Sequence, residues 1–318
     1  MLKNRGTTGF YCLANDVVSE WVIALLESIR AHEPRHQFTI IPFDDRIERL
    51  RALSQKYGFG FFEDKNLLSE LDRIGGHFSD EHFHVHVFRK FAAFWGSFDH
   101  FIFVDCDVIF LLNPEELFKA YLSTDCDFMG NDPDMDQVYK PGAFREKMIS
   151  DYSANAFNAG CFLSSQNAFS FAEIEAAQKK AQPIKESFSL VGGEQPFLNY
   201  CVHTKRLKYR SFADVVSDLS LWTWANQQVK RNGNSYRLVK PGNSENGKRM
   251  PYIHWSGLRC NRQMPNRKIF LTYRLNNSSW LSRIQYRCAS LFDWWNKGSK
   301  PVVSRRAWPS PSAEPANG

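Results

Sequence analysis

The sequence predicts an α/β protein with a mostly parallel central sheet flanked by helices. Short apolar runs of strand length alternate with amphipathic segments of helical spacing from residue 8 to residue 110. The 318 residues, of which 43% are hydrophobic and 15% aromatic, are also enough to bury the core that such a sheet needs. We therefore expect one large α/β domain over residues 1–265.

The first third of the chain repeats a strand and helix order. In an open sheet of this kind, ligands bind beyond the carboxyl ends of the strands. Asn15, Asp44, Asp45 and Asp105 fall at such ends. The predicted strands are 9–16, 37–45, 59–64 and 100–110, and the predicted helices are 17–32, 46–58 and 86–98.

After Pro114 the pattern continues with longer polar interruptions. The segment 131–154 is polar and irregular, which is typical of a loop over a binding site, and 232–251 is rich in loop-forming residues. The predicted helices are 114–122, 165–181 and 192–203, and the predicted strands are 125–132, 157–165 and 252–257.

The C-terminal part differs in composition from the rest. Residues 266–297 are basic, rich in Trp and Tyr and helical in pattern, and they predict a C-terminal helical extension. A membrane-surface patch is one interpretation, and a helix that packs back on the domain with a solvated basic side is the favoured one. Residues 298–318 are rich in Pro, Ser and Ala and are expected to be disordered.

Charge and cysteine content exclude several classes. The net charge of +6 suits an acidic or phosphorylated ligand, but the basic residues are spread along the chain, so we expect no nucleic acid as partner. The 7 cysteines include no CxxC pair, which argues against a zinc knuckle or a disulfide framework. Without a leader-like apolar segment or a run of about 18 apolar residues, a cytoplasmic protein is expected, with contact at a membrane surface left open.

The stretch "FIFVDCDVIFLLNP" places Asp105 and Asp107 in an apolar run that otherwise indicates a buried strand. Buried charge is costly unless it is compensated. Residues two apart on a regular strand point to the same face, so both carboxylates can converge on one divalent cation such as Mg²⁺ or Mn²⁺. The alternative is an Asp pair that caps the following turn.

Several segments resemble one enzyme family, in the family's order. "FVDCDVIFLLNPEELF" is similar to the DxD segment of the retaining GT-A glycosyltransferases of the glycogenin, galactinol synthase and lipopolysaccharide galactosyltransferase type. The resemblance covers roughly residues 8 to 260. Its further pieces are "LAND", "FRKFAAFW", "FNAGCFL", "GGEQPFLN" and "IHWSG".

The resemblance implies a GT-A fold and a transferase that moves a hexose from a nucleotide-diphosphate sugar, with a UDP-sugar the expected donor, to a hydroxyl of a glycan or lipid-linked glycan, with retention. It implies Mn²⁺ (or Mg²⁺) as cofactor, and an imidazole ligand favours Mn²⁺. Asp105 would be shared between the metal and the donor ribose. The implied residues are Asp105, Asp107 and His254 at the metal, Asn158, Glu194 and Gln195 in catalysis, and Leu13, Asn15, Lys90, Ala159, Gly160, Gly257 and Arg259 at the substrate.

The sequence also departs from the family pattern. Cys260 stands where the family has a Lys that contacts the diphosphate, and Arg259 or Arg262 is a candidate replacement. Val18 stands where the family often has Tyr, which leaves the nucleobase open. Glu194 replaces a more usual Asp.

Other functions remain alternatives at this stage. A non-catalytic nucleotide-sugar-binding or scaffold protein would explain the departures at Val18 and Cys260. A nucleotidyltransferase shares the sheet and the acidic site, but the first turn has no Gly- and Arg/Lys-rich loop. His82, His84 and His86 alternate, which would form a second metal face on a strand, whereas the expected helix scatters them. Oligomeric state is not predicted.

Overall fold

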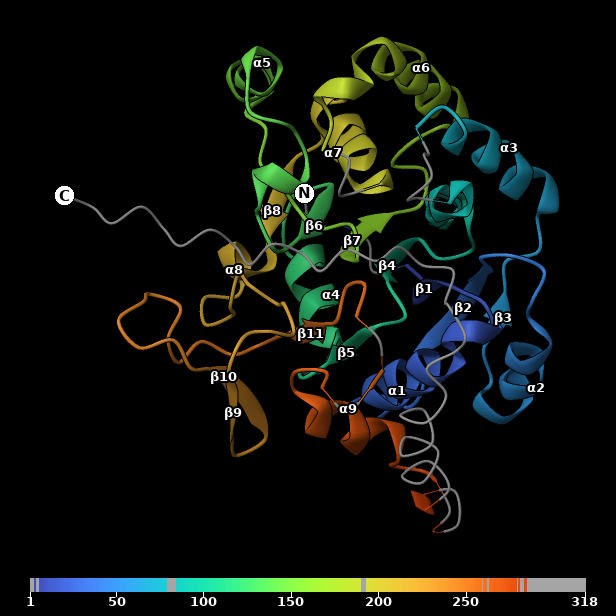
Figure 1. Ribbon diagram of the computed structural model, residues 1–318, viewed down its shortest axis with the longest axis vertical. Helices are drawn as coiled ribbons and strands as arrows, with labels where there is room; N and C mark the ends of the chain where they lie inside the picture. Colours follow the sequence, from blue (N-terminus) through green and yellow to red (C-terminus); the bar gives the residue numbers. More distant parts are fainter. Residues whose placement is uncertain are drawn as a thin grey trace.

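A computed structural model describes residues 3, 6–78, 84–189, 193–258, 260–261, 263–278, 280 and 283–284. Its core is a seven-stranded, mostly parallel sheet with the order β3-β2-β1-β4-β7-β6-β8, which confirms the predicted α/β class (Figure 1). β7 is antiparallel to both of its neighbours, β4 and β6. The strands are β1 Thr8–Ala14, β2 Gln37–Pro42, β3 Gly60–Phe61, β4 His100–Val104, β6 Phe128–Gly130, β7 Cys161–Ser165 and β8 Tyr209–Ser211.

Both faces of the sheet are buried, and β4 shows why. Phe101 and Phe103 belong to one hydrophobic cluster, and Ile102 and Val104 belong to the other. Successive strand side chains point to opposite faces, so an uninterrupted apolar run fits a strand covered on both sides. The apolar segment before Asp105 is therefore the central strand of a two-sided core.

Helices cover the two faces (Figure 1). The first cluster includes residues of α3, η2, α5, α6 and α7, and the second includes residues of α1, α2, α4 and α8. The helix bounds are η1 Asp16–Val18, α1 Ser19–Arg30, α2 Glu48–Tyr57, α3 Lys65–Gly75, η2 Val85–Trp95, α4 Glu115–Leu122, η3 Met135–Gln137, α5 Ala143–Tyr152, α6 Phe171–Ala181, η4 Gln182–Ser187, α7 Glu194–Thr204 and α8 Phe212–Val215.

A two-stranded antiparallel sheet links distant parts of the chain. β5, Val108–Phe110, pairs with β11, Tyr252–His254, in a register that sets Val108 opposite His254. A separate hairpin consists of β9, Val229–Asn232, and β10, Ser235–Leu238. The pairing of β5 with β11 brings the predicted histidine ligand next to the predicted carboxylates.

The C-terminal extension begins with α9, Arg267–Arg274, which packs on α1. The Phe270 ring meets the Trp21 indole edge-on at 4.7 Å between centroids, and Arg274 donates a hydrogen bond to Glu20. The rest of the predicted 266–297 helix and the 298–318 tail lie largely outside the described residues. Within the described part of the chain, no helix has the length and apolar character needed to cross a membrane.

Several elements differ from the sequence-based expectation, among them three helical segments. The segment predicted as an α-helix at 86–98 consists of 3-10 turns, η2. The prediction of an irregular loop at 131–154 is wrong over α5, where Met148 is the one buried residue and no apolar stripe marks the helix. Helix α3 was not predicted, although Asp64 caps its first turn by accepting a hydrogen bond from Leu67 N at 2.9 Å.

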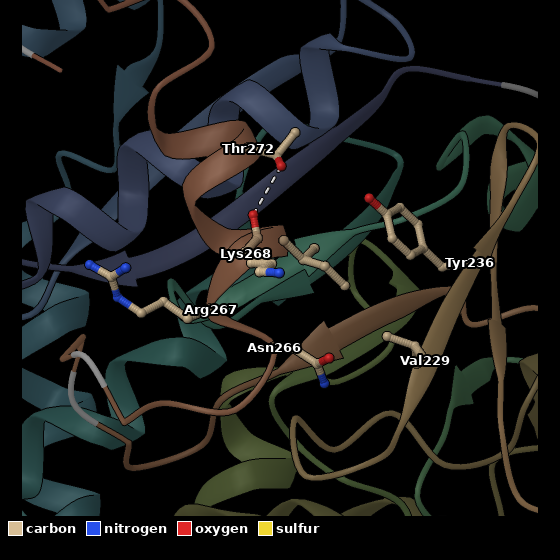
Figure 2. A pocket seen from close by; sticks show the side chains of 7 residues that line it. Val229, Tyr236, Asn266, Arg267, Lys268 and Thr272 are labelled. Carbon is tan, nitrogen blue, oxygen red and sulfur yellow. Dashed lines mark hydrogen bonds between the residues drawn. The ribbon is translucent and has the colours of Figure 1, made fainter. Parts of the chain in front are cut away.

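A surface hollow lies between α9 and the β9–β10 hairpin, apart from the sheet edge (Figure 2). Its lining is basic and aromatic, with Arg267, Lys268 and Tyr236 among the residues, and it contains no carboxylate. The Asn266 amide on its wall donates hydrogen bonds to the carbonyls of Ala225 and Gln227 at 2.7 and 2.9 Å. None of the residues that line this hollow belongs to the acidic site described next.

Candidate metal centre and active site

The two aspartates lie on a turn between β4 and β5. β4 ends at Val104 and β5 begins at Val108, so the strand does not stay regular through the pair. Val108 N donates to Asp105 O at 3.2 Å, which closes the turn, and Asp105 N donates to Gly160 O at 2.7 Å. The turn, rather than the alternation of a strand, brings the two carboxylates together.

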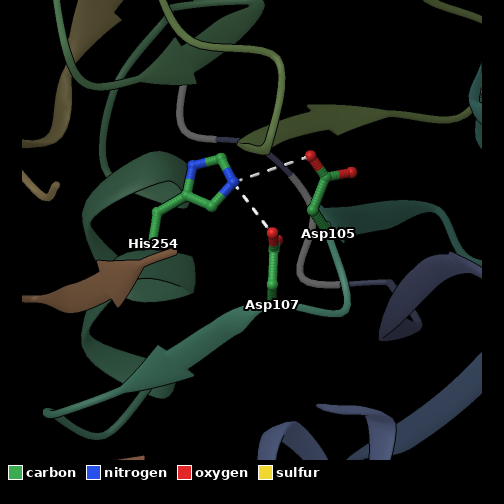
Figure 3. Close-up of side chains that lie close together, drawn as sticks. All are labelled: Asp105, Asp107 and His254. Atoms are coloured by element: carbon green, nitrogen blue, oxygen red, sulfur yellow. Dashed lines mark ion pairs between the residues drawn. The ribbon is translucent and has the colours of Figure 1, made fainter. Parts of the chain in front are cut away.

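His254 ends β11 and points at both carboxylates (Figure 3). Its Nε2 atom lies 3.3 Å from Asp107 Oδ1 and 3.8 Å from Asp105 Oδ2. The register between β5 and β11 explains the approach, because Asp107 directly precedes the residue opposite His254. Three ligand atoms, one from each residue, lie within 4.8 Å of one another.

The triad fits a divalent cation. His254 is 2% exposed, and neither of its ring nitrogens makes a hydrogen bond with a described residue, which is costly for buried polar atoms. Two carboxylate oxygens and an imidazole nitrogen are ligands suited to Mn²⁺ or a similar ion. Although burial disfavours the imidazolium, the Asp107 and then the Asp105 carboxylates raise the pKa of His254 above its ordinary value. The site therefore attracts positive charge.

Because Gly160 has no side chain, it leaves the space that the Asp105, Asp107 and His254 side chains occupy. A Cβ atom at this position would lie 2.3 Å from His254 Cε1 and 2.8 Å from Asp105 Oδ2. Real Cβ atoms do not approach other atoms so closely, so a larger residue here would push the histidine or the aspartate away. The glycine of the predicted Asn-Ala-Gly segment is thus required by the geometry of the centre.

Lys90 is a buried cation beside the triad. Its Nζ pairs with the Glu194 carboxylate, donates to Ala159 O at 3.2 Å and lies 3.5 Å from Asp105 Oδ1. Burial opposes the charge, but Asp105 and Glu194 outweigh it and raise the pKa of Lys90. Lys90 is therefore an ammonium group that compensates part of the negative charge and leaves an excess for a metal ion.

The Gln195 amide, in the first turn of α7, forms a hydrogen-bonded network with the Asn158 amide. Gln195 Oε1 accepts hydrogen bonds from Asn158 Nδ2 at 2.9 Å and from Ala159 N at 3.0 Å. Asn158 Oδ1 accepts one from Gly160 N at 2.8 Å. These bonds hold the backbone of the segment that delivers Gly160 to the triad.

The remaining predicted residues lie at the sheet edge or beyond the described part. Leu13 lies near the end of β1 and Asn15 follows that strand. Because β1 is the parallel neighbour of β4, both residues lie at the same edge of the sheet as Asp105. Asn15 caps η1 and donates to Asp44 Oδ2 at 2.9 Å, but no contact joins it to the triad. Gly257 occupies an exposed turn with a φ of 67°. Arg259 and Arg262 lie outside the described residues.

Sequence reasoning missed the residues behind His254. Asp132, in a segment predicted as a loop, accepts a hydrogen bond from Thr223 N at 2.7 Å. Burial raises the pKa of Asp132 to about 6, with the Thr223 bonds opposing that rise. Trp224 stacks on the His254 ring. No pattern in the sequence identifies these residues, because their contact with the site depends on the tertiary pairing of 223–225 with β11.

Comparison with solved structures confirms the GT-A fold. The galactosyltransferase LgtC, in complex with donor and acceptor sugar analogues, superposes with a TM-score of 0.58 at 12% identity over 88% of this chain and 99% of LgtC. An active-site mutant of LgtC superposes with a TM-score of 0.60 at 12% identity, over 85% of this chain and 96% of the mutant chain. The bifunctional glycosyltransferase WbbM gives 0.54 at 13% identity over 89% of this chain but only 52% of its own length.

Comparisons at the level of sequence find nothing. No protein-family model matches the chain, and neither does any curated protein. At these low identities the structural likeness shows the fold alone.

Proposed function

We propose that this protein is a divalent-metal-dependent glycosyltransferase that moves a hexose from a nucleotide-diphosphate sugar to a hydroxyl group of a glycan or lipid-linked glycan. The observation that carries the proposal is the convergence of Asp105, Asp107 and His254 at one edge of a GT-A sheet. A UDP-sugar as donor, and retention of anomeric configuration, follow from the resemblance of the motifs to the family.

The triad supplies what a departing diphosphate needs. When bound by Asp105, Asp107 and His254, a divalent ion supplies Lewis-acid stabilisation to the leaving diphosphate. The imidazole favours Mn²⁺ over Mg²⁺, because nitrogen ligands suit later and softer metals. Asp107, whose carboxylate is nearer to His254, is the firmer ligand, and Asp105 is shared with Lys90 and, by the resemblance, with the donor ribose.

The groups around the triad orient its side chains and compensate part of its negative charge. The Lys90 ammonium holds Glu194 and Asp105 in place, and such fixed charge acts strongly where water is excluded. Gln195 holds the Asn158 to Gly160 backbone. We assign Glu194, Gln195 and Asn158 to the reacting sugar and the acceptor, an assignment that rests on the resemblance and on their burial beside the triad.

The proposal is tested with Asp107→Ala and His254→Ala. Released nucleotide is measured for a panel of nucleotide sugars with Mn²⁺, with and without glycan acceptors. We expect the rate of both variants to fall at least 100-fold, because the loss of one ligand weakens the binding of the metal ion in the centre. Asp125→Ala is the matched control, since Asp125 is an exposed carboxylate paired with Lys208 on the surface and should keep wild-type rates.

Two outcomes would contradict the proposal in different ways. Unchanged turnover in Asp107→Ala and His254→Ala would show that the triad takes no part in the reaction. Calorimetric binding of Mn²⁺ and a nucleotide sugar by the wild type without any turnover would identify a binding or scaffold protein of the same fold instead.

A further inference from the structure

No described residue accepts a hydrogen bond from the Nδ1 side of the His254 imidazole. A ligating histidine almost always donates its second ring N–H to a carboxylate, a carbonyl or water, and that bond fixes the ring orientation. His254 Nε2 faces the two aspartates, whereas Nδ1 is buried and makes no hydrogen bond with any described residue (Figure 3). Among the described residues, packing contacts are what orients the ring on its Nδ1 side.

The Trp224 indole lies flat against this imidazole. The ring centroids are 5.4 Å apart and the two planes differ by 15°. The edge of the imidazole lies at Gly160, where a Cβ atom would be 2.3 Å from Cε1. The ring is thus packed against an aromatic face on one side and the Gly160 backbone at its edge.

The backbone fixes Trp224 beside His254. The two residues form a parallel bridge in which His254 N donates to Thr223 O and Ala225 N donates to His254 O, both at 2.9 Å. Side chains of directly paired residues lie on the same face of neighbouring strands. The stacking therefore follows from the register and does not depend on a chance rotamer.

The segment that carries Trp224 is anchored at both ends by polar groups, which are buried at one end and half-buried at the other. Asp132 accepts from Thr223 N at 2.7 Å, and Asn131 Nδ2 donates to Ser220 O at 3.0 Å. On the other side, the Asn266 amide holds the Ala225 carbonyl at 2.7 Å. A segment so fixed presents the indole as a rigid surface.

We propose that Trp224 is a positioning residue for the metal centre: its indole face holds the His254 imidazole in the orientation that directs Nε2 at the ion. The proposal rests on the metal site of the proposed function. In this role Trp224 acts on the imidazole ring, and it affects metal affinity through the orientation of that ring.

Manganese affinity of the purified full chain tests this directly, because free Mn²⁺ is measured by electron paramagnetic resonance without any turnover. Trp224→Leu removes the flat face, and we expect it to weaken Mn²⁺ binding 10-fold to 100-fold, as loss of an orienting partner typically does. Trp224→Phe restores a flat ring and should bind within about threefold of the wild type on the same grounds.

Trp222→Leu is the matched control. Trp222 lies two residues earlier in the same anchored segment, is partly buried like Trp224, and makes no ring contact with His254 in the described structure. Its variant should keep wild-type Mn²⁺ affinity. Should Trp224→Leu fail to fold, Trp224→Met takes its place with the same expectation, since it keeps more bulk but has no ring plane.

Each result decides the proposal. Equal Mn²⁺ affinity in the wild type and Trp224→Leu overturns the positioning role and leaves the triad intact. Equal weakening in Trp222→Leu and Trp224→Leu, or no rescue by Trp224→Phe, shows a general loosening of the segment and also overturns it. A wild type that binds no Mn²⁺ overturns the metal site, and with it both proposals.

Discussion

His203, on α7, is a histidine that the fold keeps neutral. Its Nε2 lies 3.0 Å from the Asn155 carbonyl, which accepts only, so Nε2 carries the proton. Its Nδ1 then accepts a hydrogen bond from the Tyr139 hydroxyl at 2.8 Å. Burial lowers the pKa of His203 to about 4, and the carbonyl opposes that shift only in part.

A pH dependence of stability follows from this lowered pKa. The unfolded chain binds a proton at His203 below about pH 6.5, whereas the folded chain does so only near pH 4, so protonation favours unfolding as the pH falls between these values. We expect the free energy of unfolding to be about 2 kcal/mol lower at pH 5 than at pH 7 because of His203. Urea denaturation at both pH values measures the difference.

His203→Gln provides the comparison for this effect. The variant has no titrating ring at this position. Between pH 7 and pH 5 its unfolding free energy should therefore fall by about 2 kcal/mol less than that of the wild type. Identical pH slopes in the wild type and the variant would show that the histidine is not held neutral in the folded state.

Single residues show where sequence reasoning succeeds. Asp105, Asp107 and His254 lie about half the chain apart, yet the order of the family-like motifs predicted that they meet, and they do. Asp132 and Trp224 could not be predicted in the same way, because neither residue type nor spacing tells that 223–225 pairs with β11. Ligands follow from local motifs, whereas their supporting groups follow from tertiary pairing.

Elements with a strong apolar period were predicted well, and short or exposed ones were not. Helix α1 buries ten of its residues and was expected at its observed place. Strand β8 has three residues and exists through its pairing with β6, and α5 buries only Met148, so neither carries a hydrophobic pattern. The missed helix α3 did have a signal, namely Asp64 followed by Leu68 and Leu71 on one face.

Phe270 is the most deeply buried side chain of helix α9. Phe270 is fully buried against Trp21 and Trp255. We expect Phe270→Ala to lower the unfolding free energy by about 3 to 5 kcal/mol, because it leaves a cavity between α9 and α1. Chemical denaturation measures the loss.

Lys268→Ala on the same helix serves as the control for this substitution. Lys268 is exposed, and its variant should stay within about 0.5 kcal/mol of the wild type. A small effect of Phe270→Ala, similar to that of the control, would mean that α9 is not packed on α1 in solution.

The whole molecule should be stabilised by its metal. An ion that binds only the folded chain stabilises it by about 2.7 kcal/mol at 100 times its dissociation constant. We expect Mn²⁺ to raise the melting temperature of the wild type and a chelator to reverse the rise. Scanning calorimetry with and without Mn²⁺ measures this.

The same measurement on Asp107→Asn and Asp125→Asn separates the centre from the surface. Asp107→Asn should lose the Mn²⁺ response because it removes a charged ligand, and Asp125→Asn should retain it. A Mn²⁺ response that persists in Asp107→Asn would place the ion elsewhere on the protein.

The fold as a whole was predictable because alternating strands and helices produce a clear alternation of apolar runs and amphipathic segments in the sequence. Both faces of β4 are buried, so its apolar run has no interruption before Asp105. The reversal of β7 was not expected, because an antiparallel central strand has the same apolar character as a parallel one.

The pairing of β5 with β11 has a consequence for how the protein is made. Asp105 and Asp107 leave the ribosome long before His254, since roughly 150 residues separate them and a chain grows at about 5 to 20 residues per second. For roughly 7 to 30 seconds, the nascent chain thus carries two aspartates with no histidine to complete their centre. Under the proposed function, loading of the ion would be a late event of biosynthesis, because only a chain synthesised past β11 offers all three residues.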